Sequence, residues 1–85
     1  MDMSKDFVWL GNDVYIPYGD ITLLTDYYQP AAKKLVKQAK EDGLLMDYSR
    51  GQGKETVALL KNGAVITTGV ELQRVLNATK DDENK

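Results

Sequence analysis

The chain has 85 residues and a mass of 9.5 kDa, which suffices for one domain with a small core. Hydrophobic residues make up 42% of it, too many for an intrinsically disordered chain, and its net charge of −2 argues against a strongly basic nucleic-acid binder. The chain contains no Cys and no His, which excludes disulfides, thiolate nucleophiles, zinc–thiolate sites and imidazole bases. We therefore expect a protein that is not an enzyme and that needs no cofactor.

The N-terminal part predicts short strands. Residues 1–6 are expected to form a flexible N-terminus. Apolar and β-branched runs at 7–10 and 14–18 flank a Gly-Asn-Asp turn and predict a β-hairpin. Pro17 cannot donate a ladder hydrogen bond, so the second strand is expected to lie at an edge or to end early. A third strand is predicted at 21–25.

The clearest helix is predicted over residues 30–42. Pro30 suits the first helical position, where its missing N–H would have no partner, and Gly43 suits the left-handed residue that ends a helix. The polar side carries Lys33, Lys37 and Lys40 within about 60° of one another. This stripe has two interpretations, a solvated helix face or a salt-sensitive contact to the DNA backbone.

The best-defined motif follows a predicted strand at 44–48 and a loop at 49–54. Asn62-Gly63 is the preferred pair for a two-residue type I′ turn, and it predicts a hairpin between strands at 56–61 and 64–68.

The register of this hairpin decides which side chains share a face. A two-residue turn pairs Leu59 with Ile66 and Leu60 with Val65, and both faces are then apolar. One long helix covers only one of them, so the second face is expected to contact another subunit. We therefore expect a homo-oligomer, with a closed ring favoured over an open array.

The C-terminal part predicts a short helix and a tail. Thr68 and Glu71 fit a capping box at the start of the helix. The ordered domain is expected to span 7–77, and residues 78–85 are expected to be a disordered tail. The predicted fold class is α+β, with a small, mostly antiparallel sheet, one main helix and a short C-terminal helix.

Targeting signals are not evident in the sequence. No apolar run is long enough for a membrane-spanning helix, and the first residues lack the basic and apolar regions of a signal peptide. We expect a cytoplasmic protein without a membrane partner.

Two stretches carry a resemblance to a known family. Leu10-Gly11-Asn12-Asp13, followed later by Asp20-Ile21, is similar to the start of the RemB branch of the bacterial extracellular matrix regulatory proteins. The second stretch aligns with the helix, loop and hairpin of RemA without a gap, through Ala39, Gly43, Asp47, Gly51, Val57, Val65-Ile66 and Val70. The resemblance covers residues 7–77. It implies a subunit fold similar to LytTR-type DNA-binding domains, assembly into rings, and activation of biofilm-matrix genes.

The family's DNA-contacting arginines are not retained. They stand before the third strand and as a pair in the loop after the fourth, which correspond here to Asp20 (or Gly19), Gln52 and Gly53. Glu55 also stands where RemA has an arginine. The resemblance therefore supports the fold and the assembly better than it supports these DNA contacts.

Two cations remain in the loop after the fourth predicted strand. Arg50 and Lys54 are candidate phosphate contacts, although the loop has the alternative interpretation of a solvated connection with glycines for turning. The piece Gly-Gln-Gly-Lys does not make a P-loop, because Tyr48 stands where the pattern needs Gly and Glu55 where it needs Ser or Thr.

Aromatic and acidic residues offer weaker signals. Four of the five tyrosines crowd together and would either stack on bases or pack in strands and interfaces: Tyr15, Tyr18, Tyr27 and Tyr28. Four aspartates lack the spacing of a calcium loop, so no metal site is expected: Asp13, Asp20, Asp26 and Asp47.

Two functional hypotheses follow. The first is an oligomeric transcriptional regulator of biofilm and extracellular-matrix genes that binds double-stranded DNA through many weak contacts on a ring. Its candidate nucleic-acid contacts are Arg50, Lys54, Lys33, Lys37 and Lys40. The alternative is an oligomeric scaffold or protein-interaction module of the same fold that does not bind DNA, which the acidic pI of about 4.9 and the lost arginines favour.

Overall fold

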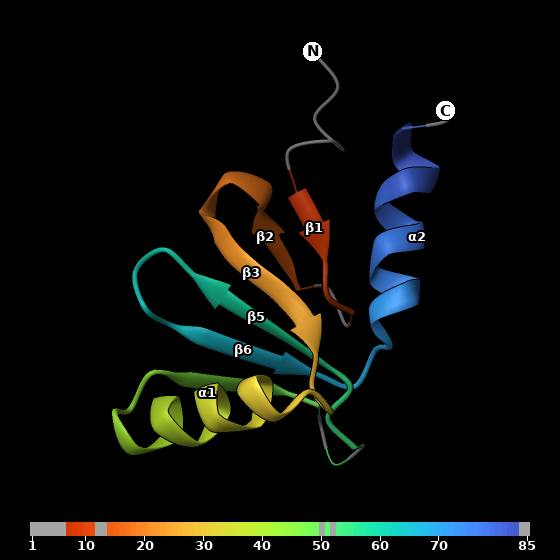
Figure 1. Cartoon of the computed structure of the whole chain (residues 1–85). Coiled ribbons are helices and arrows are strands. Elements are labelled where there is room, and N and C mark those ends of the chain that lie inside the picture. The colour runs from red at the N-terminus through yellow and green to blue at the C-terminus, as the bar shows by residue number, and fades with distance from the viewer. Residues whose placement is uncertain (1–6, 12–13, 50, 52, 84–85) are drawn as a thin grey trace.

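The computed structural model describes residues 7–11, 14–49, 51 and 53–83, with side chains to residue 77. The elements in chain order are β1 (Phe7–Trp9), β2 (Tyr15–Pro17), the 3-10 turn η2 (Tyr18–Asp20), β3 (Ile21–Asp26), α1 (Pro30–Glu41), β4 (Leu45–Tyr48), β5 (Thr56–Leu60), β6 (Val65–Thr68) and α2 (Leu72–Glu83) (Figure 1). The α+β class is confirmed. None of the described helices has the length and apolar character needed to cross a membrane.

The strands form two sheets. β1 and β2 make a two-stranded antiparallel hairpin, and the other four strands lie in the order β3-β5-β6-β4. β5 pairs antiparallel with β3 and β6, whereas β4 runs parallel to β6. The prediction of a mostly antiparallel sheet is confirmed, as is the N-terminal hairpin, in which Pro17 ends β2.

Helix α1 matches its prediction to within one residue. Pro30 is its first residue, and Ala32, Val36 and Ala39 are buried on one side. Gly43 follows its end with φ +72°, and the Leu44 N–H donates to the Ala39 carbonyl at 2.8 Å. This is the Schellman arrangement that closes helices at a glycine.

The β5–β6 turn differs from the two-residue turn predicted. The Leu60 N–H donates to the Ala64 carbonyl at 2.9 Å, and the Gly63 N–H donates to the Leu60 carbonyl at 3.0 Å. These bonds enclose a three-residue loop in which Gly63 has φ +91°. A three-residue loop with glycine at its last position is the next commonest hairpin connection, so the Asn-Gly pair marked the hairpin correctly but not its length.

The longer loop shifts the register by one residue. Leu59 pairs with Val65 and Ala58 with Ile66, so the predicted pairs of Leu59 with Ile66 and Leu60 with Val65 were wrong. A shift by one residue moves side chains to the opposite face of a strand pair.

Both faces of this sheet are covered by the chain itself (Figure 1). On one face, Val57 and Val65 pack against the buried side of α1. On the other, Ala58 and Ile66 pack with residues from β1, the β1–β2 connection and α2: Val8, Leu10 and Val75. The N-terminal hairpin and α2 thus cover the face that was expected to contact another subunit.

Helix α2 begins and ends later than predicted. The Glu71 carbonyl accepts the first helical N–H groups, from Arg74 and Val75, so Thr68 is not the capping residue. The Thr68 hydroxyl instead donates to the Leu10 carbonyl at 2.6 Å.

Both helices contain twelve residues, so α2 is not the short helix that was predicted. The structure continues it through residues 78–83, within the stretch that was predicted to be a tail. Residues 1–6 and 84–85 lie outside the described part of the chain.

Candidate nucleic-acid interface

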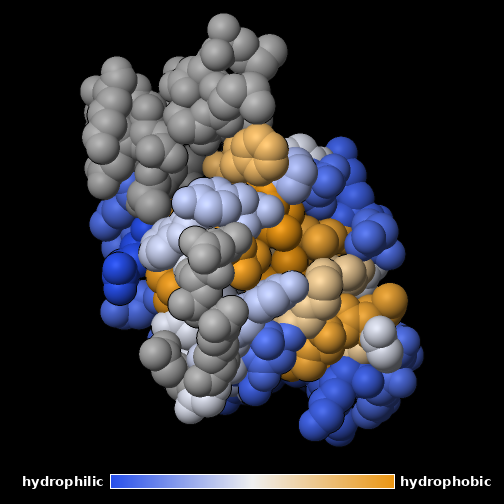
Figure 2. All heavy atoms as spheres, turned by 180° about the vertical axis from the view of Figure 1, so that it is seen from behind, coloured by the Kyte–Doolittle hydropathy of each residue, from blue (hydrophilic) through white to orange (hydrophobic). Residues whose placement is uncertain are grey.

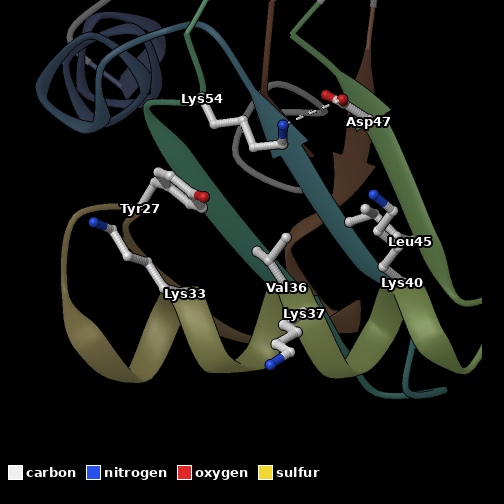
Figure 3. Close-up of a pocket in the computed structure, with 8 residues that line it drawn as sticks. All are labelled: Tyr27, Lys33, Val36, Lys37, Lys40, Leu45, Asp47 and Lys54. Atoms are coloured by element: carbon white, nitrogen blue, oxygen red, sulfur yellow. Dashed lines mark ion pairs between the residues drawn. The ribbon is translucent and has the colours of Figure 1, made fainter.

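A groove of about 310 Å³ lies between α1 and the sheet face that α1 covers (Figure 3). Four of its lining side chains are lysines, three from α1 and one from the loop before β5. We call it the lysine groove; its residues are Tyr27, Lys33, Val36, Lys37, Lys40, Leu45, Asp47 and Lys54. The structure thus brings together the helix stripe and the loop cation, which the sequence could only treat as separate candidates.

The lysines are spread along the groove because they occupy successive turns of α1. Val36 points toward the sheet between them and is buried. In Figure 3 Lys33 lies at the Tyr27 end, Lys40 rises beside Leu45, and Lys37 points away from the sheet. Lys33 and Lys40 therefore place positive charges at separate points along the groove, a spacing that suits a polyanion better than a single small anion, whereas the Lys37 ammonium group is directed outward.

Tyr27 lines one end of the groove, and the ring of Tyr28 lies beside it. The Lys33 Nζ lies 5.8 Å from the ring centre of Tyr27 and 5.7 Å from that of Tyr28. The two rings meet edge to face at 5.7 Å between centres. The Tyr28 hydroxyl donates to Glu55 at 3.4 Å, and the Glu55 carboxylate raises the pKa of Tyr28. Lys33 is therefore placed over the two rings, within the range of a cation–π interaction.

The opposite wall is organised by the Asp47 carboxylate. Its Oδ1 accepts hydrogen bonds from the Ser49 N–H at 2.9 Å, the Ser49 hydroxyl at 2.7 Å and the Thr67 hydroxyl at 2.9 Å. Its Oδ2 lies 3.6 Å from the Lys54 Nζ, the ion pair drawn in Figure 3. The bonds from Ser49, with smaller contributions from Thr67 and Lys54, lower the pKa of Asp47 to about 2. Asp47 is thus ionised at neutral pH and holds Lys54 at the groove.

This network predicts a specific pH dependence of stability. The pKa of Asp47 falls from 3.8 to about 2 on folding, so its contribution is present above pH 4 and is lost as the pH falls through 2. Because the side chain is 42% exposed, solvent screening reduces the contribution to on the order of 1 kcal/mol. The wild-type protein should therefore have a higher free energy of unfolding than Asp47→Asn at pH 6, and this difference should disappear near pH 1.5. Urea titrations of both proteins measure this difference. A difference that does not change with pH would contradict the predicted contribution of the Asp47 carboxylate.

The remaining candidate, Arg50, and two of the positions at which the family has arginines, Gln52 and Asp20, are not among the described residues of the groove. Arg50 and Gln52 lie outside the described residues. Asp20 lies at the other end of β3, where its carbonyl accepts from the Lys61 N–H at 2.9 Å, so it is not brought to the groove. Within the described residues, no group of three or more acidic side chains is placed to hold a metal ion.

Sequence reasoning missed the role of Asp47 and the position of Tyr27 at the lysine groove. Asp47 was weighed only as a metal ligand, although an Asp two residues before a Ser is typical of a turn closed by the carboxylate. Nothing local to Tyr27 signals the groove, because its neighbours there come from α1 and from the loop before β5.

The chemistry of the lysine groove is that of a cationic surface. Ammonium groups bind phosphate oxygens as point charges, and aromatic rings add a surface on which bases or sugars can pack. Comparison with known proteins adds no assignment: no protein-family model matches the chain, and no curated protein matches its sequence.

Proposed function

We propose that this chain is a DNA-binding regulator, not an enzyme, whose lysine groove contacts the phosphates of double-stranded DNA. The gathering of Lys33, Lys37, Lys40 and Lys54 on one groove carries the proposal. The whole chain has 11 basic and 13 acidic residues, so this groove is a local positive feature on a negative molecule. Such a distribution favours binding in one orientation over diffuse attraction.

The resemblance to the RemA and RemB family supports the wider role. On this proposal the protein is a cytoplasmic bacterial regulator of biofilm and extracellular-matrix genes, built on a LytTR-like subunit and assembled as a homo-oligomeric ring. A few lysines per subunit bind DNA weakly, but copies held on one rigid assembly increase the avidity without any new contact. Arg50 is proposed as an additional contact from the loop that carries Lys54.

A scaffold or protein-interaction module is the second candidate. Lys54 is already paired with Asp47, and Lys33 lies over two tyrosine rings, so both cations have partners within the chain. The family's arginine positions are occupied by Asp20, Gln52 and Gly53. These observations favour an oligomer that binds protein rather than DNA.

Salt-dependent DNA binding separates the two candidates. Fluorescence anisotropy with a labelled duplex between about 50 and 200 mM salt gives the slope of log K against log [salt]. The variant Lys40→Gln/Lys54→Gln should flatten this slope by about two units, since each lost phosphate contact removes roughly 0.9.

The matched control removes two charges elsewhere. Lys34 and Lys61 are exposed and do not line the lysine groove, so Lys34→Gln/Lys61→Gln should leave the slope close to that of wild type. An equal change of the salt slope in both variants would mean that DNA binding depends on the overall charge of the protein rather than on the groove. Absence of wild-type binding at the lowest salt would favour the scaffold.

A further inference from the structure

Strand β4 is an open edge of the four-stranded sheet. It is the last strand in the order β3-β5-β6-β4 and pairs only with β6 among the described strands. The Val65 N–H donates to the Leu44 carbonyl at 3.0 Å, which sets the alternation along the strand. In a parallel pair alternate residues bond to the neighbour, so the backbone groups of Leu45 and Asp47 point to the open edge.

This edge exposes apolar side chains on the sheet face opposite α1. Met46 pairs with Ile66 and so shares its face, and it is 37% exposed. Leu44 lies two residues before it and is 42% exposed. Figure 2, which views the molecule from behind, shows hydrophobic residues gathered across the middle of this side. An open backbone edge beside apolar side chains is a template for adding another strand.

The opposite edge of the sheet is less suited to pairing. The register of β3 against β5 shifts between Ile21 and Leu23, an irregularity that interrupts a regular row of donors and acceptors. In β4, by contrast, four consecutive residues pair with β6 without interruption. Leu23 is nevertheless 46% exposed, so β3 offers a control position of similar exposure.

We propose that β4 pairs antiparallel with β4 of a second copy of this chain, across a two-fold axis at Met46. The proposal rests on the self-association proposed above and assigns a surface to it. Only Leu45 and Asp47 direct their backbone N–H and C=O groups to the open edge. The hydrogen bonds between the two β4 strands must therefore come from these residues. With the axis at Met46, Leu45 of each copy bonds with Asp47 of the other.

Side-chain chemistry favours this register over one with the axis at Asp47. An axis at Asp47 would place two carboxylates opposite each other, which destabilises a strand pair. The axis at Met46 places the two methionines together and Leu44 opposite Tyr48 of the second copy. On the α1 side, Asp47 faces Leu45 of the second copy, beside which Lys40 rises in Figure 3. Apolar groups thus meet apolar groups, and a carboxylate meets the neighbourhood of an ammonium group.

The geometry has a consequence for DNA binding. Antiparallel pairing keeps each sheet face on one side of the joined sheet, so both lysine grooves lie on the same side of the dimer. The contact is self-complementary and closes at two copies, and a larger ring needs a second contact surface.

Cross-linking tests the register directly. The chain has no cysteine, so Met46→Cys introduces a single thiol, and the Cβ atoms of a non-bonded antiparallel pair lie about 5 Å apart. Mild oxidation at micromolar concentration should convert Met46→Cys into a covalent dimer of twice 9.5 kDa. Leu23→Cys, on the other edge, should remain monomeric on a reducing-agent-free gel. Equal cross-linking of the two variants would overturn the proposal.

Native mass provides an independent readout. Sedimentation equilibrium should give a mass of at least two copies for wild type and for Leu23→Lys, and a smaller mass for Met46→Lys, which places two ammonium groups on the axis. A monomeric wild type, or a Met46→Lys variant with the wild-type mass, would overturn the pairing. Circular dichroism confirms that each variant is folded, and if Met46→Lys does not fold, the cross-linking comparison decides.

Failure of this pairing is distinguishable from failure of DNA binding. If wild type is monomeric while Lys40→Gln/Lys54→Gln still flattens its salt slope, the edge pairing is overturned and the DNA-binding proposal stands. If both hold, Met46→Lys should weaken duplex binding by about tenfold or more through lost avidity.

Discussion

Gly11→Ala should lower the free energy of unfolding by about 3 kcal/mol, through backbone strain and overpacking together. Gly11 has φ +96°, a conformation that side chains other than hydrogen resist. A Cβ added there would lie 2.5 Å from Cγ2 of Val70, far inside van der Waals contact. Val70 is β-branched and stiff at χ1, so it cannot rotate away cheaply. Urea unfolding of the variant measures the loss.

Two matched variants separate strain from overpacking. Gly43 also has a positive φ, +72°, but a Cβ there would meet nothing within 4 Å, so Gly43→Ala should cost only about 1 kcal/mol. Val70→Ala removes the atom that an alanine at Gly11 would meet. In that background Gly11→Ala should cost about half as much, because the strain remains while the overpacking is relieved. An equal cost in both backgrounds would contradict the predicted contact with Val70.

Thr68→Val should cost about 2 kcal/mol, because it keeps the shape of a buried side chain and removes its hydroxyl. Thr68 is 1% exposed, and its Oγ1 donates to the Leu10 carbonyl at 2.6 Å while accepting from the Val70 N–H at 3.3 Å. Leu10 is itself fully buried, so its carbonyl would be left without this donor in a site that water does not reach. Chemical unfolding monitored by circular dichroism gives the value.

Thr68→Ser provides the control for this hydrogen bond. It retains the hydroxyl and loses one methyl group, so its cost should be about 1 kcal/mol, below that of Thr68→Val. A larger loss for serine than for valine would mean that packing, rather than the bond to Leu10, stabilises this junction. The bond joins residues 58 positions apart, at the place where the N-terminal hairpin meets the end of β6.

Local signals in the sequence were sufficient for the elements themselves. Pro30 and Gly43 bracket α1 because each residue has a backbone preference that acts within one turn of helix. Pro17 likewise ends β2, since a residue without an N–H cannot continue a ladder. Alternation and β-branched residues placed the remaining strands for the same local reason.

The register of the β5–β6 hairpin and the residue that caps α2 could not be predicted from local signals in this way. The Asn62-Gly63 pair is compatible with loops of two or three residues, and the packing of Val57 and Val65 on α1 accompanies the longer loop. Thr68 has the sequence of a helix cap, yet its hydroxyl bonds the Leu10 carbonyl in the folded chain. A hydroxyl makes the hydrogen bond that the fold offers it, and this one depends on a residue far away in the chain.

The sequence by itself determined the fold class, the strands and the main helix, and it singled out the lysines of α1 and Lys54. Only the tertiary structure decided that Lys54 lies in the groove formed with α1, opposite Asp47 and near Tyr27. It also decided that this chain, rather than a second subunit, covers both faces of the β5–β6 hairpin. Backbone preferences act over a few residues, so the local sequence is enough to predict them. Contacts between α1, β4 and the loop before β5 arise from packing of apolar surface, which any segment of the chain can supply.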